Sequence, residues 1–335
     1  MAMIARILAD WYAQAARPLP FREQRDPYAI WVSEIMAQQT RIAALLPYYA
    51  RFMAAFPTVQ HLAAASVDDV LALWAGLGYY SRARLLHKAA NIITTQGMPA
   101  DYAGWRALPG IGDYTAAAIA SIAFEQPIAA VDGNVLRVFA RLTAYENDIL
   151  APQSKKDATI WTTALHQAGV APSVITQALM ELGALICTPK SPNCQDCPLR
   201  QHCQAFKQGN QNILPVRLAK TTKTEIQRPV FVIIDQERRV LFRKRTEKLL
   251  HGLYEFPDST LDLPILERRA LPPSRHVFTH LVWHMQGEMI FTTTPDSLPD
   301  NFRWTTAAEC DTLAIPTAFK TYVKSLREYW AACHC

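Results

Sequence analysis

The sequence has no long hydrophobic run. Its 335 residues contain no stretch of eighteen apolar residues without a charge, whereas a helix needs roughly 20 such residues to cross a bilayer. The first segment, MAMIARILADWYAQAARPLPF, has charges between its apolar positions, which is typical of an amphipathic helix and not of a secretory signal peptide. We therefore expect no membrane partner and a cytoplasmic protein.

A strong charge of one sign is also missing, as are internal repeats and low-complexity tracts. The formal net charge of +5 permits a polyanionic partner such as nucleic acid but does not require one. Half of the residues are apolar and 19% are charged, a composition typical of globular proteins. The length leaves room for two domains of ordinary size, and we expect a monomer.

The cysteines do not form a disulfide-like set. They are odd in number, seven, and four of them fall in the segment CTPKSPNCQDCPLRQHC, with the spacing C-x6-C-x2-C-x5-C. This usage favours a reducing compartment and a metal site made of Cys187, Cys194, Cys197 and Cys203. Zinc sites usually pair two short cysteine clips across a longer loop, whereas these four cysteines share one compact loop, which favours an iron–sulfur cluster. Zinc and free thiols remain the alternatives.

Hydrophobic periodicity divides the chain into two parts. Residues 1–207 have apolar residues at intervals of three to four, which predicts helices. Residues 208–227 are polar and predict a linker. Residues 228–335 contain two strand-like pairs, VFVIIDQERRVLFRKR and RHVFTHLVWHMQGEMIFTTT, and then the helical pattern TAFKTYVKSLREYW. We therefore predict a multidomain protein, with an all-helical region followed by a small α+β domain.

The segment LPGIG lies between two helical patterns and points to DNA. Its glycines allow a tight turn, and the helix after it offers backbone N–H groups to a phosphate. It resembles the helix-hairpin-helix motif of DNA-repair proteins, with Leu108, Gly110 and Gly112 as DNA-binding residues, although a plain helix–helix turn has the same pattern. Twenty residues after the turn, Asp132 opens a further helix, where an N-cap is the simplest interpretation.

The order of hairpin, helix, aspartate and four-cysteine loop resembles the endonuclease III superfamily of DNA glycosylases over roughly residues 25–205. The resemblance implies that Asp132 is catalytic and that the cysteine loop holds a 4Fe-4S cluster beside the DNA-binding surface. Members with lyase activity have a lysine two residues after the second hairpin glycine, and its amine attacks the sugar. Tyr114 stands there, and no lysine occurs between Lys88 and Lys155, so we expect hydrolysis without efficient strand cleavage.

Further motifs narrow the resemblance. The segments WVSEIMAQQTRI, which contains Glu34, and GLGYYSRARLLHKAA resemble MutY-type adenine DNA glycosylases, and GLYEFP and RHVFTH resemble that family's second domain. The resemblance implies a base-excision-repair enzyme that acts on double-stranded DNA with A·8-oxoguanine or A·G mispairs. It would flip the adenine out of the helix and hydrolyse its glycosidic bond. Considered alone, Glu34 could be an exposed glutamate of an amphipathic helix.

The chemistry of base removal suits these residue types. Adenine leaves readily only after a ring nitrogen is protonated, and Glu34, in an apolar setting, could keep its proton near neutral pH and act as general acid. Asp132 would stabilise the oxocarbenium-like sugar, and the resemblance implies that it bonds transiently to C1′, in parallel with the nucleophilic carboxylate of retaining glycosidases. The resemblance gives Tyr114 and Asn134 as residues that orient Asp132 or the attacking water.

The resemblance also implies contacts with the DNA and with the extruded base. The residues that enter the base stack or flank the opposing base are Gln39, Thr40, Leu77 and Tyr79. The adenine pocket consists of Arg17, Leu19, Arg22, Gln177 and Met180, for which ordinary packing is the alternative. Phe21 stands where the family more often has tryptophan.

The C-terminal part resembles the Nudix fold of 8-oxo-dGTP hydrolases but lacks the G-x5-E-x7-R-E-x2-E-E box that holds magnesium in those enzymes. We therefore expect it to recognise 8-oxoguanine and not to hydrolyse nucleotides. Phe278, Thr279 and His280 match the family's F-S-H loop, with threonine in place of serine. Two other functions stay open, a glycosylase for a different lesion on the same scaffold and an iron–sulfur protein that binds lesions without cutting.

Overall fold

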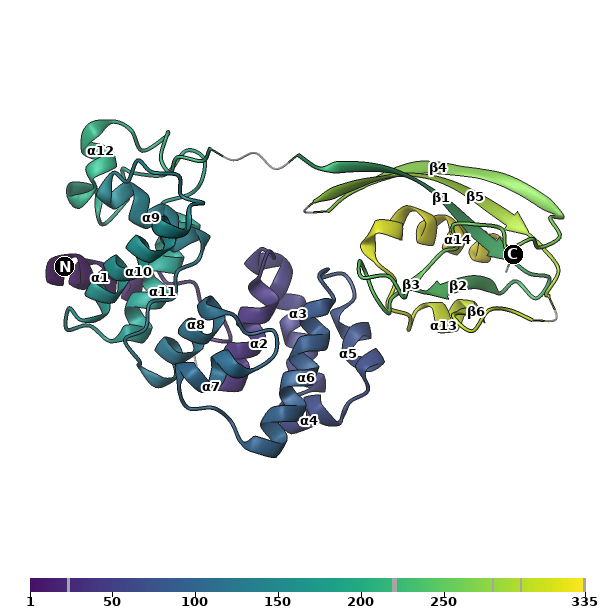
Figure 1. Cartoon of the computed structure of the whole chain (residues 1–335), viewed down its shortest axis with the longest axis horizontal. Helices are drawn as coiled ribbons and strands as arrows, with labels where there is room; N and C mark the ends of the chain where they lie inside the picture. Colours follow the sequence, from purple (N-terminus) through teal and green to yellow (C-terminus); the bar gives the residue numbers. More distant parts are fainter. Residues whose placement is uncertain (23–24, 219–221, 279, 296, 334–335) are drawn as a thin grey trace. The chain divides into compact units, whose positions relative to one another are not determined.

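The computed structural model describes residues 1–22, 25–218, 222–278, 280–295 and 297–333. The described residues form two compact units (Figure 1). The first unit holds residues 1–64 and 88–218, and the second holds residues 65–87 and 222–333. The predicted domain boundaries at residues 207 and 228 stay predictions.

The described part of the first unit is helical, as predicted, apart from its loops. Its helices are α1 (Ala2–Ala15), α2 (Pro27–Ala37), α3 (Ile42–Ala55), α4 (Val59–Ala64), α7 (Tyr102–Ala107), α8 (Asp113–Phe124), α9 (Gly133–Thr143), α10 (Pro152–His166), α11 (Pro172–Leu185) and α12 (Gln204–Gln208), with a 3-10 turn at Arg200–His202. Helix α6 (Ser81–Gln96) begins in the second unit and ends in the first.

Helix α2 shows why these segments fold as they do. The Asp26 side chain accepts hydrogen bonds from the Tyr28 and Ala29 N–H groups, and Pro27 occupies the first turn, where its missing N–H costs nothing. Nearly all residues of α2 are buried, so the helix passes through the interior. Helix α11 packs against α1, α8 and α9, and these contacts bring α2, α8, α9 and α11 around one cavity.

The segment 208–218 does not behave wholly as a linker. Leu214 is buried in the helical core, and its carbonyl accepts a hydrogen bond of 3.0 Å from Arg141 Nε. The Ile149 N–H donates to the Val216 carbonyl at 2.9 Å. These contacts fix the segment to the first unit as far as Val216.

The second unit is built on a mixed sheet. Its strands are β1 (Thr224–Ile234), β2 (Val240–Lys244), β3 (Tyr254–Glu255), β4 (Glu267–Val277), β5 (Leu281–Phe291) and β6 (Phe302–Thr305). Its helices are α5 (Val67–Trp74), α13 (Ala307–Cys310) and α14 (Lys320–Ala332), with a 3-10 turn at Thr317–Phe319. The strand order is β3-β2-β1-β5-β4, and β6 pairs with β2. Both predicted strand pairs are confirmed as antiparallel pairs, β1 with β2 and β4 with β5.

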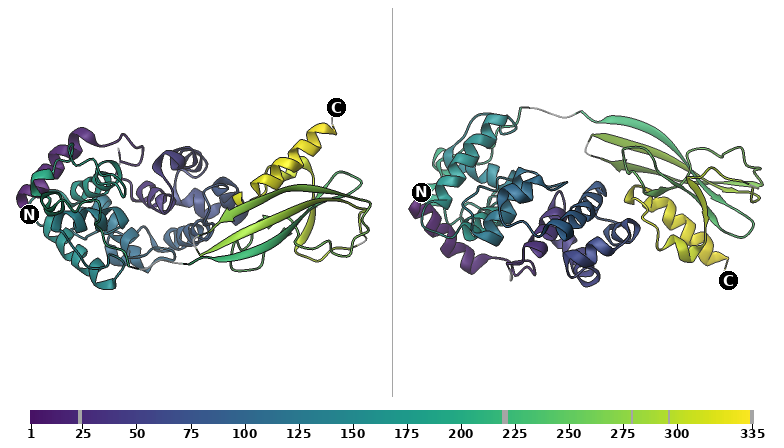
Figure 2. Two further views of the ribbon diagram at one scale, coloured as in Figure 1. Left: turned by 90° about the horizontal axis from the view of Figure 1, so that it is seen from above. Right: turned by 60° about the horizontal axis from the view of Figure 1, so that its bottom comes forward.

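The two faces of the sheet are covered differently. Helix α14 packs on one face (Figures 1 and 2), where its Tyr322, Leu326 and Trp330 join the larger core. A second, smaller hydrophobic cluster is separate from this core and contains Ile233, Leu241 and Ile290. Strands β1 and β5 pair in parallel along their whole length, which the two predicted strand pairs did not anticipate.

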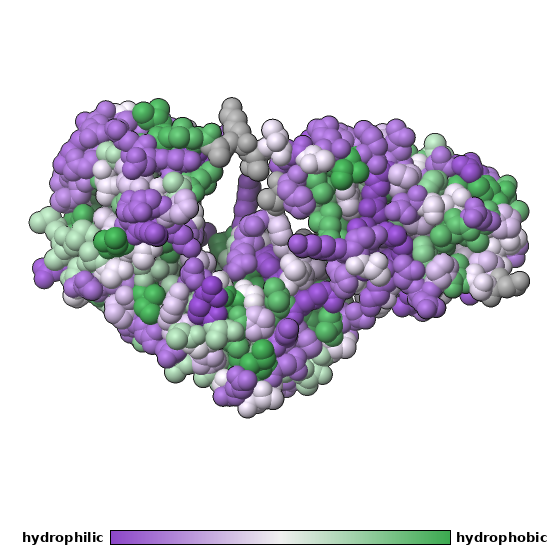
Figure 3. Space-filling view, viewed as in Figure 1, coloured by the Kyte–Doolittle hydropathy of each residue, from purple (hydrophilic) through white to green (hydrophobic). Residues whose placement is uncertain are grey.

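None of the described helices is long and apolar enough to cross a membrane. The face drawn in Figure 3 is mostly hydrophilic, with apolar residues in scattered patches.

Candidate active site

A cavity of about 840 Å³ in the first unit brings the predicted catalytic residues together. Glu34 comes from α2, Tyr114 from α8, Asn134 from α9, and Asp132 from the residue before α9. All four side chains line the cavity. Two carboxyl groups therefore face one space large enough for a ligand.

Glu34 combines burial with one hydrogen bond. The Tyr114 hydroxyl donates to Glu34 Oε2 at 2.8 Å and also lies 3.8 Å from Met180 Sδ. Burial, helped by the nearby Asp132 charge, raises the pKa of Glu34 to about 7 against the hydrogen bond from Tyr114 and the charge of Arg22. A carboxyl group with this pKa keeps a proton in a large fraction of molecules at neutral pH, which is what a general acid requires.

Asp132 is the N-cap of α9, as the simplest interpretation predicted. Its Oδ1 accepts from the Val135 N–H at 2.7 Å, and its Oδ2 accepts from Asn134 Nδ2 at 2.8 Å. Burial raises the pKa of Asp132 in spite of these bonds. The cap holds this carboxyl group at the helix N-terminus, where the positive end of the helix dipole favours its ionised form.

Arg137, which the sequence analysis missed, positions the Asn134 side chain through a hydrogen bond. Its Nη2 donates to Asn134 Oδ1 at 2.8 Å and to the Gly183 carbonyl at 2.7 Å. Its Nε donates to the Cys187 carbonyl at 2.7 Å. Gly183 must be glycine at this approach, because a Cβ there would lie 2.6 Å from Asn134 Cβ. The sequence signal that could have identified Arg137 was an arginine on the buried face of an amphipathic helix.

The five predicted adenine-pocket residues all line the same cavity, namely Arg17, Leu19, Arg22, Gln177 and Met180. Glu181, a further residue that the sequence analysis missed, ties two of them to α11. Arg17 contacts its carboxylate with Nε at 2.6 Å and Nη2 at 2.7 Å, and Arg22 Nη2 contacts it at 2.7 Å. Burial alone would raise the pKa of Glu181, but the hydrogen bonds from both arginines lower it to about 2.

The predicted DNA-contacting residues lie on tight turns. Gln39 and Thr40 follow α2 at the same cavity, and Gln39 has a φ of 59°. Leu108, Gly110 and Gly112 form the turn between α7 and α8, where Gly110 has a φ of 80° and Gly112 is the N-cap of α8. The turn predicted from LPGIG is thus present, and the first N–H groups of α8 lie directly after it.

Leu77 and Tyr79 lie in the second unit, on the loop between α5 and α6. Tyr79 has a φ of 49°, and it is 45% exposed. Arg82 Nη2 donates to the Gly78 carbonyl at 3.2 Å, and its guanidinium group lies over the Tyr79 ring at 5.4 Å. These contacts hold the exposed ring of Tyr79, whose backbone has a conformation that non-glycine residues seldom adopt.

The second unit contains a separate cavity of about 280 Å³. Tyr79, Phe278 and His280 line it, together with loop residues Lys248–His251 and with His276. Thr279 lies outside the described residues. The cavity therefore brings together Tyr79, Phe278 and His280, although about two hundred positions separate Tyr79 from Phe278.

The four predicted metal-ligand cysteines line one small cavity with Arg141. Arg141 is 2% exposed, and its Nη1 lies 3.4 Å from Cys187 Sγ. Burial, together with the charges of the neighbouring cysteines, raises the pKa of the Cys197 thiol to about 12. In the described part of the chain no three His, Cys, Asp or Glu side chains converge on a single-ion site. Four thiols spread around one space beside a buried cation suit a multi-atom anionic cluster.

Comparisons with known proteins agree with this arrangement. Residues 32–162 match the HhH-GPD superfamily base excision DNA repair protein model, residues 187–203 match the iron-sulfur binding domain of endonuclease III, and residues 229–325 match the NUDIX domain. Together with the cysteine geometry, the second match assigns one 4Fe-4S cluster to the four-cysteine loop.

Curated relatives match most of the chain. The adenine DNA glycosylase of Mus musculus is 31% identical over 96% of this chain and 77% of its own length, and that of Homo sapiens is 32% identical over 93% and 72%. A thermostable thymine-DNA glycosylase structure covers 62% of this chain and 96% of its own, with a TM-score of 0.56 and 24% identity. An endonuclease III–DNA complex covers 62% and 95%, with a TM-score of 0.51 and 22% identity. The two structures show the helical fold alone.

Proposed function

Because the chain belongs to the adenine DNA glycosylase family, we propose that it excises adenine paired with 8-oxoguanine or guanine in double-stranded DNA. The reaction is hydrolysis of the glycosidic bond during base excision repair, without efficient strand cleavage. The observation that carries the proposal is Glu34, whose pKa is raised to about 7, in one cavity with Asp132.

The two carboxyl groups divide the work. The adenine is flipped out of the duplex into the cavity of about 840 Å³. Glu34 then donates its proton to a ring nitrogen of the adenine, which makes the base a better leaving group. The Tyr114 hydroxyl, 2.8 Å from Glu34 Oε2, keeps the carboxyl group in place during this step.

Asp132 stabilises the positive charge that develops on the sugar as the bond breaks. Its own oxygens are held by the Val135 N–H and by Asn134, so it is oriented before the substrate arrives. Water then adds to the sugar and leaves an abasic site. The absence of a lysine among the described residues that line this cavity supports hydrolysis over Schiff-base chemistry.

The arginines that line the cavity, Arg17 and Arg22, recognise the extruded base. Arg17 and Arg22 are held by the buried Glu181, so their remaining donors are fixed in direction. Leu19, Gln177 and Met180 complete the walls. Gln39, Thr40, Leu77 and Tyr79 take the place of the extruded base or flank its partner, and the Leu108–Gly112 turn binds the backbone phosphates.

The opposing 8-oxoguanine is read by the cavity of the second unit. Its volume of about 280 Å³ is near the lower end of ligand pockets, roughly 300 Å³. Phe278 and Tyr79 offer aromatic faces, and His280 offers a ring nitrogen. The Nudix magnesium box is missing from the sequence, and none of residues 256–266, all described, is helical, which supports recognition without nucleotide hydrolysis.

The 4Fe-4S cluster supplies iron–thiolate bonds that cross-link residues 187–203. Arg137 and Arg141 of α9 both contact Cys187, so the cysteine loop and the catalytic Asp132 are attached to the same helix. A monomer acting on chromosomal DNA in the cytoplasm fits this function.

Single-turnover assays test the proposal. The protein is mixed with duplexes that contain A·8-oxoguanine, A·G, T·G or an oxidised pyrimidine, and base release and strand cleavage are measured separately. We expect adenine release from the first two duplexes, strand breaks only after alkali, and no adduct after borohydride treatment. Release of thymine or of the pyrimidine in preference to adenine would refute it, and binding without any release would identify a lesion-binding protein.

A further inference from the structure

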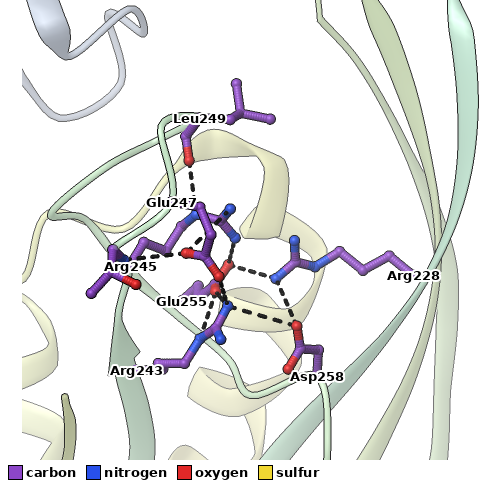
Figure 4. Close-up of polar contacts among 8 residues, drawn as sticks. Arg228, Arg243, Arg245, Glu247, Leu249, Glu255 and Asp258 are labelled. Carbon is purple, nitrogen blue, oxygen red and sulfur yellow. Dashed lines mark hydrogen bonds and ion pairs between the residues drawn. The ribbon is translucent and has the colours of Figure 1, made fainter. Parts of the chain in front are cut away.

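A buried carboxylate in the second unit is surrounded by three arginines (Figure 4). Glu255, on β3, is fully buried and accepts a hydrogen bond from Arg228 Nη2 at 2.7 Å, from Arg243 Nε at 2.9 Å and from Arg245 Nη1 at 2.5 Å. The arginine side chains are between 5% and 16% exposed. Asp258 and Glu247, both partly exposed, contact the same arginines from outside.

Such a network is a costly way to stabilise a small domain. Each buried ion loses its hydration, and apolar residues of similar volume often stabilise a core as well or better. A buried charge cluster is better suited to fixing the direction of particular side chains, because a guanidinium group bonds only in fixed directions. The elements that these arginines hold therefore indicate what the cluster does.

Arg245 holds one wall of the 280 Å³ cavity. Its Nε donates to the Leu249 carbonyl at 2.9 Å, and its backbone closes the same loop through Leu253 and Gly252. The residues Lys248–His251 of this loop line the cavity. The Arg245 guanidinium group bridges Glu255 and the Leu249 carbonyl. Without it, this loop would lose the side-chain hydrogen bond that fixes it to the sheet.

Arg228 reaches another part of the cavity lining through aromatic contacts. Its guanidinium group lies 4.3 Å from the centre of the Trp283 ring, a distance at which cation–π attraction acts. Trp283 in turn meets Phe278 edge to face, with ring centres 4.8 Å apart. Phe278 lines the cavity, so a line of contacts runs from Glu255 through Arg228 and Trp283 to Phe278.

We infer that Glu255 is a specificity-determining positioning residue, which fixes two parts of the lining of the 280 Å³ cavity, the Lys248–His251 loop and Phe278, through Arg245 and Arg228. The inference rests on the proposed function, since it assigns the network to discrimination between 8-oxoguanine and guanine. The network does not touch the cavity of Glu34 and Asp132, so excision from A·G should not depend on it.

The test uses the full chain with the substitutions Glu255→Gln, Arg245→Met and Arg228→Met. The measured quantity is the ratio of single-turnover rates and of binding constants on A·8-oxoguanine and A·G duplexes. We expect each substitution to lower this ratio about tenfold, which corresponds to about 1.4 kcal/mol, with an unchanged rate on A·G. Arg245→Met and Arg228→Met leave Glu255 paired with two arginines, so they decide the matter if Glu255→Gln fails to fold.

Asp235→Asn is the matched control. Asp235 is a buried carboxylate of the same unit that pairs with Arg239 at 2.7 Å, and neither residue lines the cavity. We expect it to keep the wild-type ratio, with circular dichroism confirming that all variants are folded. The inference is overturned, and the proposed function is not, if folded Arg245→Met and Arg228→Met keep the wild-type rate ratio. The same holds if Asp235→Asn lowers that ratio as much as they do. A wild-type protein with no preference for A·8-oxoguanine overturns the proposed function, and the inference with it.

Discussion

Glu34 shows how one side chain acquires a function from its surroundings. An ordinary glutamate is ionised at neutral pH, but burial on the inner side of α2 raises the pKa of Glu34 to about 7. The same burial stabilises the protonated form in the folded state and penalises the ionised form. Activity and stability should therefore depend on pH through the same group, in ways that can be measured separately.

The first prediction concerns the pH dependence of adenine release. Glu34 carries its proton below about pH 7, so the single-turnover rate should fall about tenfold per pH unit above it. On the acid side the rate should fall as Asp132 becomes protonated, at a pH above the usual aspartate range because burial raises its pKa. Rates between pH 4 and 9 on an A·8-oxoguanine duplex would show the bell shape, and a rate that stays level up to pH 9 would remove Glu34 as the acid.

The second prediction concerns the stability of Glu34→Gln. Because the folded pKa is raised from 4.5 to about 7, the contribution of Glu34 to wild-type stability is greatest below pH 4.5 and declines until about pH 7. The decline amounts to roughly 3 kcal/mol at 1.36 kcal/mol per unit, and glutamine removes it while still accepting the Tyr114 hydrogen bond. The variant should be inactive yet more stable than wild type at pH 8, and no more stable at pH 4. Urea unfolding at both pH values measures this, and an equal difference at the two would contradict it.

Among the helices, α9 joins the cavity of Glu34 and Asp132 to the four-cysteine loop. Asp132 caps its N-terminus, Arg137 lies one turn further and Arg141 lies one turn beyond that. The two arginines contact the backbone carbonyl and the sulfur of Cys187. One helix thus carries both the carboxylate that we propose as catalytic and the contacts to a cluster ligand.

The third prediction tests α9 by the substitution Arg137→Met. It removes the donors to Asn134 Oδ1 and to the Gly183 and Cys187 carbonyls, and each buried acceptor left without a partner costs about 1–3 kcal/mol. We expect lower stability and an adenine-release rate reduced at least about tenfold, with DNA binding less affected. Arg327→Met serves as control, because Arg327 is 62% exposed and pairs with an exposed aspartate. If Arg137→Met excises adenine at the rate of the control, the contacts of Arg137 are not needed for catalysis.

Under the proposed function, the first of the two units of the chain carries out base excision and the second reads the lesion. The Glu34 and Asp132 cavity lies wholly in the first unit, and the 280 Å³ cavity lies in the second. Removing the sheet should therefore alter substrate choice more than base excision. The place of the cut matters, since Leu214 and Val216 are bonded to the helical unit.

The fourth prediction is that a chain ending at Leu218 still releases adenine from A·G but prefers A·8-oxoguanine less. The loss of Phe278, His280 and their cavity should lower the preference by roughly 10- to 100-fold, since each 1.4 kcal/mol is about tenfold. Single-turnover rates on both duplexes measure the ratio for the truncated and full-length chains. A chain that ends at Gln211 should be less stable than one that ends at Leu218, because it lacks the contacts of Leu214. An unchanged preference would place lesion reading in the helical unit.

Features that depend only on neighbouring residues could be predicted before the structure. The turn at Leu108–Gly112, the Asp132 cap and the four-cysteine spacing each lie within a short segment, where local geometry leaves few conformations. The two strand pairs and the last helix followed from periodicity for the same reason. The Nudix-like domain and the family could be predicted because several such segments occur in a fixed order.

Contacts between side chains that are distant in the sequence could not be predicted in this way. Tyr114 bonds Glu34 across 80 positions, and Glu181 holds Arg17 across 164, because helices far apart in the chain pack around one cavity. Sequence spacing says nothing of such contacts, so Glu181, Arg137 and the Glu255 network were missed. Their partners are buried charges, whose pairing depends on desolvation and on directional hydrogen bonds that exist only in the folded chain.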